Sequence, residues 1–217
     1  MLSILRQRAV KHTLQKIVKV LKRSERSHYY FGYGANLSVK RFEDRQMNVE
    51  EIGNAVLMNH EVKFSLSNEY KKKGYAGVHP KQDGEVWGVL YKMDRLSLAL
   101  LDTLEWCGFG AYERKEVEVF VDSSQKRQKA WCYFVQRPKF DLFPSKIYLN
   151  NMIKASHERG FPDSYINFLK AQDYRENFEI DHGFSLLFYG KRRILERKLK
   201  PIYKIHDQLR EKLCELI

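Results

Sequence analysis

The sequence predicts an α+β fold: a small, mostly antiparallel β-barrel flanked by helices, with an amphipathic helix added at each end. Short runs typical of strands outnumber helical stretches in the central part of the chain. These runs do not alternate with helices as they would in a doubly wound sheet. With 217 residues, 43% of them hydrophobic, and no stretch of about 18 apolar residues, the chain predicts a globular core and no membrane span.

Residues 1–27 are predicted to form a basic amphipathic helix. Residues 2–23 contain no acid, and their apolar residues recur at helical spacing from Val10 to Leu21. The segment resembles an organelle presequence and equally a helix that lies on a membrane surface. It lacks the continuous apolar region of a secretory signal. Packing of its apolar stripe on the body of the protein is the structural alternative.

The central part of the chain begins with an aromatic, extended run, His28–Tyr33. A glycine-containing turn follows, and a helical stretch begins near Ser38. Four later runs have strand character: Ala55–Leu66, Glu85–Tyr91, Glu116–Val121 and Ala130–Val135. Between the second and third of these, Asp94 can cap a helix over Leu96–Leu104.

Two further helices are predicted from the proline and glycine residues that bound them. Pro144-Ser145 starts the first, which Gly160 ends, and Pro162-Asp163 starts the second. Residues 173–217 are predicted to form a helical extension, since apolar residues recur at three- and four-residue steps from Leu195 to Leu216. Pro201 predicts a kink or a new helix there. We expect this face to pack against the N-terminal helix or a second subunit.

The net charge of +12 is confined to the two ends of the chain. Residues 1–27 carry +7, residues 191–217 carry +5, and residues 28–190 contain 22 basic and 22 acidic residues. Neither end interleaves aromatic residues with its basic ones, as a base-stacking surface does. We therefore expect no nucleic-acid partner. Peripheral membrane contact or self-association through the basic terminal helices remains the alternative for the ends.

The cysteines and histidines indicate no metal site. The three cysteines show no CxxC spacing, and the seven histidines form no HxxxH or HExxH pair. An odd number of unpatterned cysteines is simplest in a reducing compartment, so a cytoplasmic location is expected, with organelle targeting through residues 1–27 as the alternative. Cys107 is a rival candidate as a thiol nucleophile, but no histidine adjoins it, and a small buried side chain is the favoured role.

The turn Gly32-Tyr33-Gly34-Ala35-Asn36 is the first candidate site. Two glycines on either side of an aromatic residue allow a sharp turn that points successive main-chain N–H groups at one place, as in an anion cradle or oxyanion hole. A plain turn, with Asn36 capping the following helix, explains the same residues.

Glu105 is the second candidate. It follows Leu101 by four residues and Leu98 by seven, so it ends an otherwise apolar helical stripe. A carboxylate in that position is expected to be partly desolvated, with its pKa raised toward the range useful for proton transfer near neutrality. A solvated glutamate at a helix end is the alternative. Asp102 is expected to face solvent or form a turn.

These motifs together resemble those of the γ-glutamylcyclotransferases. Residues 30–37 (YFGYGANL) resemble the family's Y-F-x-Y-G-S-N-L signature, with Ala35 in place of the common serine, and residues 84–91 resemble its E-V-W-G-V strand. Glu105 falls on the catalytic glutamate of the family's L-D-x-x-E motif. Three later segments match in order: Tyr112 with Glu116–Val119, Trp131-Cys132-Tyr133, and Tyr148 twelve residues before Gly160-Phe161-Pro162. The resemblance covers about residues 29–172, outside the two basic ends.

The resemblance implies a γ-glutamylcyclotransferase-like domain over residues 28–172. Its implied reaction converts a γ-glutamyl amide or amino acid, a small-molecule substrate, into 5-oxoproline plus a free amine or amino acid, without a cofactor. Glu105 would be the general acid/base. The implied substrate-binding residues are Tyr30, Phe31, Gly32, Tyr33, Gly34, Ala35 and Tyr148. The leaving group stays open between amino acid, peptide such as glutathione, polyamine and aminoglycoside-like compounds. A catalytically silent binding module of the same fold, recruited by its basic ends to a membrane or protein partner, is the alternative.

Overall fold

The computed structural model describes residues 27–45, 47–68 and 73–176 of the chain. The two predicted terminal helices therefore lie outside the described residues, apart from Ser27 and residues 173–176. The elements in chain order are β1 (His28–Gly32), η1 (Ala35–Leu37), α2 (Lys40–Glu43), β2 (Val49–Asn68), β3 (Lys73–Met93), α3 (Arg95–Leu104), η2 (Cys107–Phe109), β4 (Tyr112–Val121), β5 (Lys126–Val135), α4 (Lys146–Glu158) and α5 (Asp163–Lys170).

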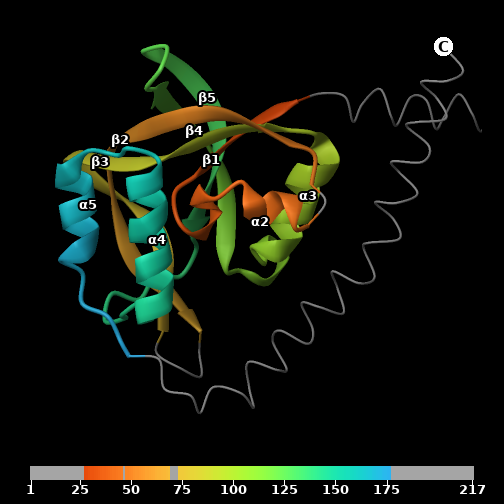
Figure 1. Cartoon of the computed structure of the whole chain (residues 1–217). Helices are drawn as coiled ribbons and strands as arrows, with labels where there is room; N and C mark the ends of the chain where they lie inside the picture. The colour runs from red at the N-terminus through yellow and green to blue at the C-terminus, as the bar shows by residue number, and fades with distance from the viewer. Residues whose placement is uncertain (1–26, 46, 69–72, 177–217) are drawn as a thin grey trace, which may run out of the picture. The chain divides into compact units, whose positions relative to one another are not determined.

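The strands form a closed barrel in the order β1, β3, β2, β4, β5 (Figure 1). β1 runs antiparallel to β3 and parallel to β5, while β4 is antiparallel to both β2 and β5. In the middle of β1, Tyr30 lies opposite Tyr91 of β3 and Trp131 of β5. Closure gives each of the described strands a neighbour on both sides along part of its length. The predicted, mostly antiparallel barrel with several helices is confirmed.

The residues group into two compact units, which we describe one at a time. Among the described residues, the first unit takes 27–33, 48–62 and 77–137, which include β1, most of β2 and β3, α3, β4 and β5. The second takes 34–45, 47, 63–68, 73–76 and 138–176, which include η1, α2, α4 and α5.

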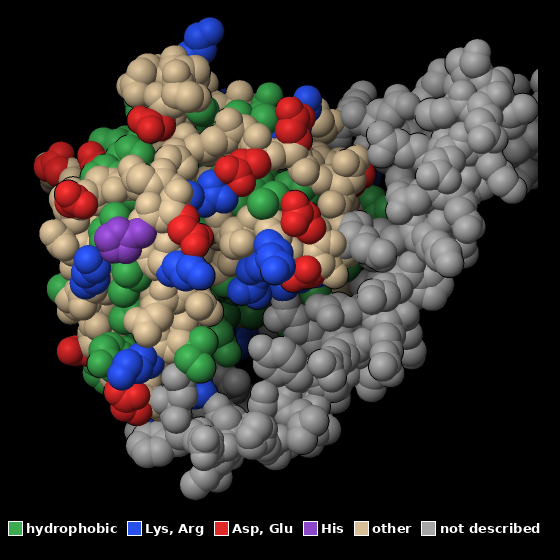
Figure 2. Space-filling model, in the orientation of Figure 1, with side chains coloured by type: hydrophobic (Ala, Val, Ile, Leu, Met, Phe, Trp, Pro, Cys, Tyr) green, Lys and Arg blue, Asp and Glu red, His purple; other side chains and the backbone are tan. Residues whose placement is uncertain are grey.

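In the first unit, β4 and β5 form a regular hairpin, paired from Tyr112 opposite Val135 to Val121 opposite Lys126. Ion pairs lie across this hairpin, from Lys129 to Glu116 at 3.1 Å and from Arg127 to Glu118 at 3.0 Å. Figure 2 shows acidic and basic side chains mixed on the visible face. This mixture agrees with the formal neutrality of residues 28–190.

β2 and β3 are longer than the sequence predicts, and each contains one non-glycine residue in the left-handed region. These residues are Asn59 and Asp83, each with φ of 58°, and the N–H of Asp83 donates to Oδ1 of Asn59 at 3.2 Å. Asn and Asp are the residues that adopt this conformation most readily outside glycine. A long strand can bend at such a position without losing its neighbours.

Helix α3 begins and ends where its sequence indicates. The Asp94 side chain accepts a hydrogen bond from the N–H of Ser97 at 2.7 Å, which satisfies one of the donors at the helix start. Leu98 and Leu101 are buried on its apolar face, and Glu105 follows as the C-cap residue. The apolar stripe therefore leads to Glu105, as expected.

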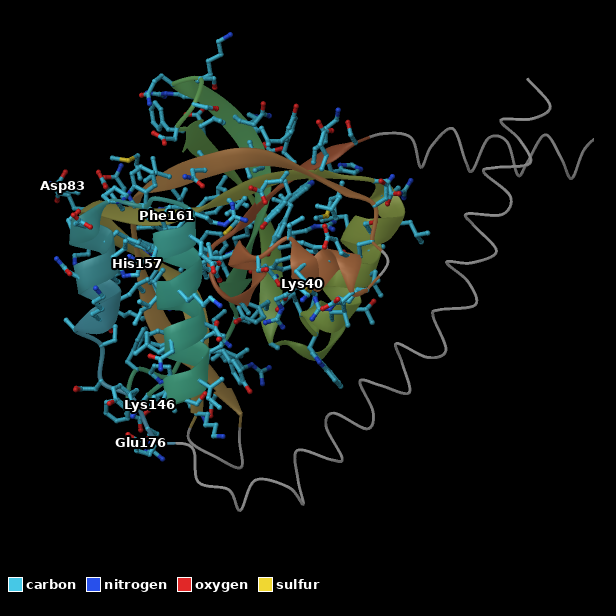
Figure 3. All side chains as sticks on the ribbon, viewed as in Figure 1. Lys40, Asp83, Lys146, His157, Phe161 and Glu176 are labelled. Atoms are coloured by element: carbon cyan, nitrogen blue, oxygen red, sulfur yellow. The ribbon has the colours of Figure 1, made fainter. Side chains whose placement is uncertain are left out.

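In the second unit, α4 and α5 lie side by side (Figure 1). The Ser145 side chain caps α4 by accepting from the N–H of Tyr148, and Gly160, with φ of 64°, lies just past its end. At the start of α4, Lys146 and Glu176 form an ion pair at 2.9 Å, which Figure 3 shows as neighbouring side chains. The helices predicted after Pro144-Ser145 and after Pro162 are thus both present.

Candidate active site

β1 carries the first candidate residues into the barrel core. Tyr30 is 2% exposed and Phe31 is fully buried. The Tyr30 ring lies 5.6 Å from the Tyr133 ring and 6.2 Å from the Tyr91 ring, while Phe31 packs 6.4 Å from Tyr33. In this structure Tyr30 and Phe31 are therefore packing residues, and their role as walls around a substrate stays a prediction.

Tyr33 is fixed by a hydrogen bond from its side-chain hydroxyl. The ring is 5% exposed, and its hydroxyl donates a 2.6 Å hydrogen bond to the main-chain oxygen of Tyr133 in β5. A buried carbonyl that lost this donor would be costly, because water cannot replace the donor. The bond therefore fixes the end of β1, where the glycine turn begins, to β5.

The turn itself continues into the second unit as the short helix η1. The N–H of Leu37 donates to the oxygen of Gly34 at 3.1 Å, and Leu37 is buried. At the C-cap of α4, Nε of Arg159 donates to the main-chain oxygen of Leu37 at 2.6 Å. The turn is thus closed by its own main chain and attached to α4.

Gly34 and Tyr148 meet in the second unit. A Cβ built on Gly34 would lie 3.0 Å from the hydroxyl oxygen of Tyr148 and 3.3 Å from Cβ of Ala76. Glycine at position 34 therefore allows the close approach of this hydroxyl to the turn. The same hydroxyl accepts a hydrogen bond from the N–H of Ala76 at 3.4 Å.

Tyr148 stands on the first turn of α4 between two aromatic rings. Phe64 lies 6.2 Å from it and Tyr75 lies 5.5 Å from it, both edge to face. Edge-to-face packing limits the rotation of the Tyr148 ring, so its hydroxyl is held near Gly34. The exposed fraction of Tyr75 is 39%, so one side of this aromatic group faces solvent.

Glu105 lies in the first unit, at the end of α3. Its N–H donates to the oxygen of Leu101 at 2.8 Å, and its side chain is half-buried. The next residue, Trp106, has φ of 56° and ψ of 36°, in the left-handed region that a bulky residue rarely adopts. The chain therefore turns sharply immediately after Glu105, the C-cap residue of α3.

Asp102, one turn earlier, has a different environment from the one expected. Its Oδ1 accepts from the Tyr133 hydroxyl at 2.8 Å, and its Oδ2 accepts from Nη1 of Arg114 at 2.7 Å. Its side chain is 31% exposed. Asp102 therefore lies in α3 and not in a turn, and the side chain expected to face solvent is only partly exposed, because partners on β4 and β5 hold both of its oxygens.

Cys107 follows this group closely. Burial raises the pKa of its thiol, and the nearby carboxylates of Asp102 and Glu105 raise it further, to about 12. The thiolate is the nucleophilic form of cysteine, and it is scarce near neutral pH at such a pKa. The environment of Cys107 therefore argues against a thiol nucleophile.

The structure thus places the candidate residues in two groups. Tyr30, Phe31, Gly32, Tyr33 and Glu105 belong to the first unit, and Gly34, Ala35 and Tyr148 belong to the second. The sequence patterns did not single out Arg114 and Tyr133 as partners of Asp102.

Within the described residues, no three His, Cys, Asp or Glu side chains form a group that could hold a metal ion. In the described part of the chain, no helix has the length and hydropathy needed to cross a membrane.

Comparison with known proteins supports the fold. Residues 85–169 match the model of the AIG2-like family. A bovine γ-glutamylcyclotransferase is 29% identical over 157 residues, which cover 69% of this chain and 82% of the relative, and the human protein of that name is 29% identical over 152 residues, covering 68% and 79%. A solved γ-glutamyl cyclotransferase structure superposes with a TM-score of 0.64 at 27% identity, covering 71% of this chain and 92% of that one.

Proposed function

We propose that this chain, which has the γ-glutamylcyclotransferase fold and sequence similarity to these enzymes, converts a γ-glutamyl amide or γ-glutamyl amino acid into 5-oxoproline and the free amine or amino acid. The proposal rests on Glu105, a half-buried residue at the C-cap of α3 and within residues 85–169, which match the AIG2-like family. A partly buried carboxylate is suited to exchange protons with a bound amine. Asp102, three residues earlier, is paired with Arg114 at 2.7 Å, and the resemblance to the L-D-x-x-E motif gives the catalytic role to Glu105.

The reaction is an internal acyl transfer. The α-amine of the glutamyl group attacks its own γ-carbonyl carbon, a five-membered ring closes, and the C–N bond to the leaving group breaks. Glu105 accepts the proton that the attacking nitrogen loses and delivers it to the leaving nitrogen. No atom is supplied from outside, so the enzyme acts mainly by holding the substrate folded, with amine and carbonyl in contact.

The resemblance assigns the glycine turn and Tyr148 to binding of the glutamyl group. Main-chain N–H groups of the Tyr33–Ala35 turn donate to the substrate carboxylate or to the developing oxyanion. The Tyr148 hydroxyl, 3.0 Å from the position of a Cβ on Gly34, orients the glutamyl group. Ala35 lacks the hydroxyl of the serine that is common in the family. A turn that acts through its main-chain N–H groups does not need this hydroxyl.

A product assay on the full chain tests the proposal. The chain is incubated with a panel of γ-glutamyl amino acids, glutathione, and γ-glutamyl derivatives of a polyamine and an aminoglycoside, and 5-oxoproline is measured by chromatography. Glu105→Gln should remain folded and lose at least about a hundredfold in turnover, which is within the usual contribution of a proton-transfer group. Glu113→Gln, at an exposed glutamate paired with Lys115 on β4, is the matched control and should keep its activity.

Two results would contradict this proposal. Retained activity in Glu105→Gln would remove Glu105 from the proton transfer. Absence of 5-oxoproline from every member of the panel would favour the silent binding module.

A further inference from the structure

Tyr133 connects the two parts of the first unit that carry candidate residues. Its main-chain oxygen accepts from the hydroxyl of Tyr33, at 2.6 Å, and its own hydroxyl donates to Oδ1 of Asp102, at 2.8 Å. Tyr33 belongs to the glycine turn, and Asp102 stands one helical turn before Glu105. One residue of β5 therefore contacts both segments.

The second partner of Asp102 lies opposite Tyr133. Arg114 and Tyr133 face each other across the β4–β5 hairpin, and Nη1 of Arg114 lies 2.7 Å from Oδ2 of Asp102. The guanidinium is also held over the ring of Trp131, 4.8 Å from its centre. Stacking on an aromatic ring restricts an arginine side chain, so less entropy is lost when it binds a carboxylate.

Burial strengthens the bond from Tyr133. The Tyr133 ring is 2% exposed, and burial raises the pKa of its hydroxyl far above the usual range, with the charge of Asp102 adding to the effect. The hydroxyl therefore stays protonated and donates at any pH at which the protein is folded. A hydrogen bond from such a donor to an ionised carboxylate is stronger than one between neutral groups.

These bonds act on a part of the helix that is otherwise weak. The last turn of an α-helix has carbonyl groups without helical partners and frays readily. In α3 this turn contains Asp102, ends at Glu105 and leads into the left-handed Trp106. Contacts from β4 and β5 to Asp102 hold the turn against the barrel.

We propose that Asp102 and Tyr133 are positioning residues, which fix the end of α3 so that the carboxylate of Glu105 is held in one orientation relative to Tyr33 of the same unit. The inference rests on the proposed function, since it gives Glu105 a reaction to be positioned for. A carboxylate suits position 102 because it accepts from two donors at once. An amide in its place has only one acceptor atom: its NH2 group would face Arg114 and lose that bond, or face the Tyr133 hydroxyl, which could then no longer donate to position 102.

Asp102→Asn, Tyr133→Phe and the double variant test the proposal in the full chain. Glu118→Gln is the matched control: it breaks a 3.0 Å ion pair with Arg127 on the same hairpin, where Arg127 likewise stacks on an aromatic ring, that of Phe120. Kinetics with the best substrate of the panel and hydrogen exchange of a peptide covering residues 101–107 are measured on each variant.

For both single variants we expect kcat to fall by about 10- to 100-fold with KM within about threefold of the wild type, because misorientation affects the reacting geometry more than binding. The double variant should lose about as much as the worse single variant, since one network is broken either way. The amide of Glu105 should exchange at least about tenfold faster than in Glu118→Gln.

The outcomes separate this proposal from the proposed function. If kcat stays within about twofold of the wild type in both single variants, or falls equally in Glu118→Gln, the positioning role is overturned. If the wild type releases no 5-oxoproline, the proposed function fails. The exchange experiment then decides alone: unchanged exchange at Glu105 overturns the role of Asp102 and Tyr133 in holding the end of α3, and faster exchange supports it.

Discussion

Gly88 of β3 lies so close to Gly32 of β1 that a Cβ on Gly88 would be 2.5 Å from the main-chain oxygen of Gly32 and 2.6 Å from the ring of Phe31. We predict that Gly88→Ala lowers the free energy of unfolding by at least about 2 kcal/mol, because a main-chain oxygen cannot move aside as a flexible side chain can. Urea denaturation measures the change.

Gly108→Ala is the control for this substitution, since a Cβ on Gly108 would meet nothing within 4 Å. It should change the free energy of unfolding by less than about 0.5 kcal/mol. Equal unfolding curves for Gly88→Ala and Gly108→Ala would contradict the close approach of β1 and β3 at Gly32.

The hydrogen bond from Tyr33 to the oxygen of Tyr133 supports a prediction about stability. Tyr33→Phe removes the donor and leaves a buried carbonyl without it, so we expect a loss of about 1–3 kcal/mol and a lower Tm. Thermal unfolding followed by circular dichroism measures it. Tyr174→Phe, at a tyrosine that is 46% exposed, should leave the Tm nearly unchanged. A Tyr33→Phe protein as stable as the wild type would show that this bond adds nothing to the fold.

The helix boundaries could be predicted from the sequence because the signals that set them are local. Asp94 and Ser145 each accept from an N–H three residues later, and Gly160 follows α4 in the left-handed conformation. The lengths of β2 and β3 could not be predicted in this way, because the signals that set them are not local. Residues 73–84 contain Gly, Pro and Asp, which favour turns, yet they belong to β3, whose length depends on neighbouring strands far away in the sequence.

A pattern in the sequence can nominate a candidate residue only where one segment carries the pattern. The stripe of α3 makes Glu105 a candidate, and adjacent residues make the glycine turn one, while the roles of both stay predictions. The pairing of Asp102 could not be found in this way, because its partners lie 12 and 31 residues later, on two different strands. That pairing requires the register of β4 and β5, which places Arg114 opposite Tyr133.

The contact between Gly34 and Tyr148 predicts a relationship between two substitutions. Gly34→Ala should destabilise the protein by about 1 kcal/mol or more, because the new Cβ meets the Tyr148 hydroxyl at 3.0 Å. In a Tyr148→Phe background that hydroxyl is absent, so the same substitution should cost less. Urea denaturation of the two single variants and the double variant measures the difference. Identical costs in both backgrounds would contradict the contact.

The raised pKa of Cys107 gives a prediction with a definite direction in pH. Because burial and two carboxylates raise this pKa from 9.0 to about 12, the thiol stays protonated between pH 9 and 11, where an ordinary cysteine is ionised. Alkylation of Cys107 by iodoacetamide, followed by mass spectrometry, should therefore remain slow over that range in the folded protein. In urea the alkylation rate should rise with pH, with a midpoint near 9, as for an exposed thiol.

Cys107→Ala should keep 5-oxoproline release within about twofold of the wild type, since no thiolate takes part in the proposed reaction. A folded-state midpoint near 9, or loss of activity in Cys107→Ala, would restore the thiol as a nucleophile.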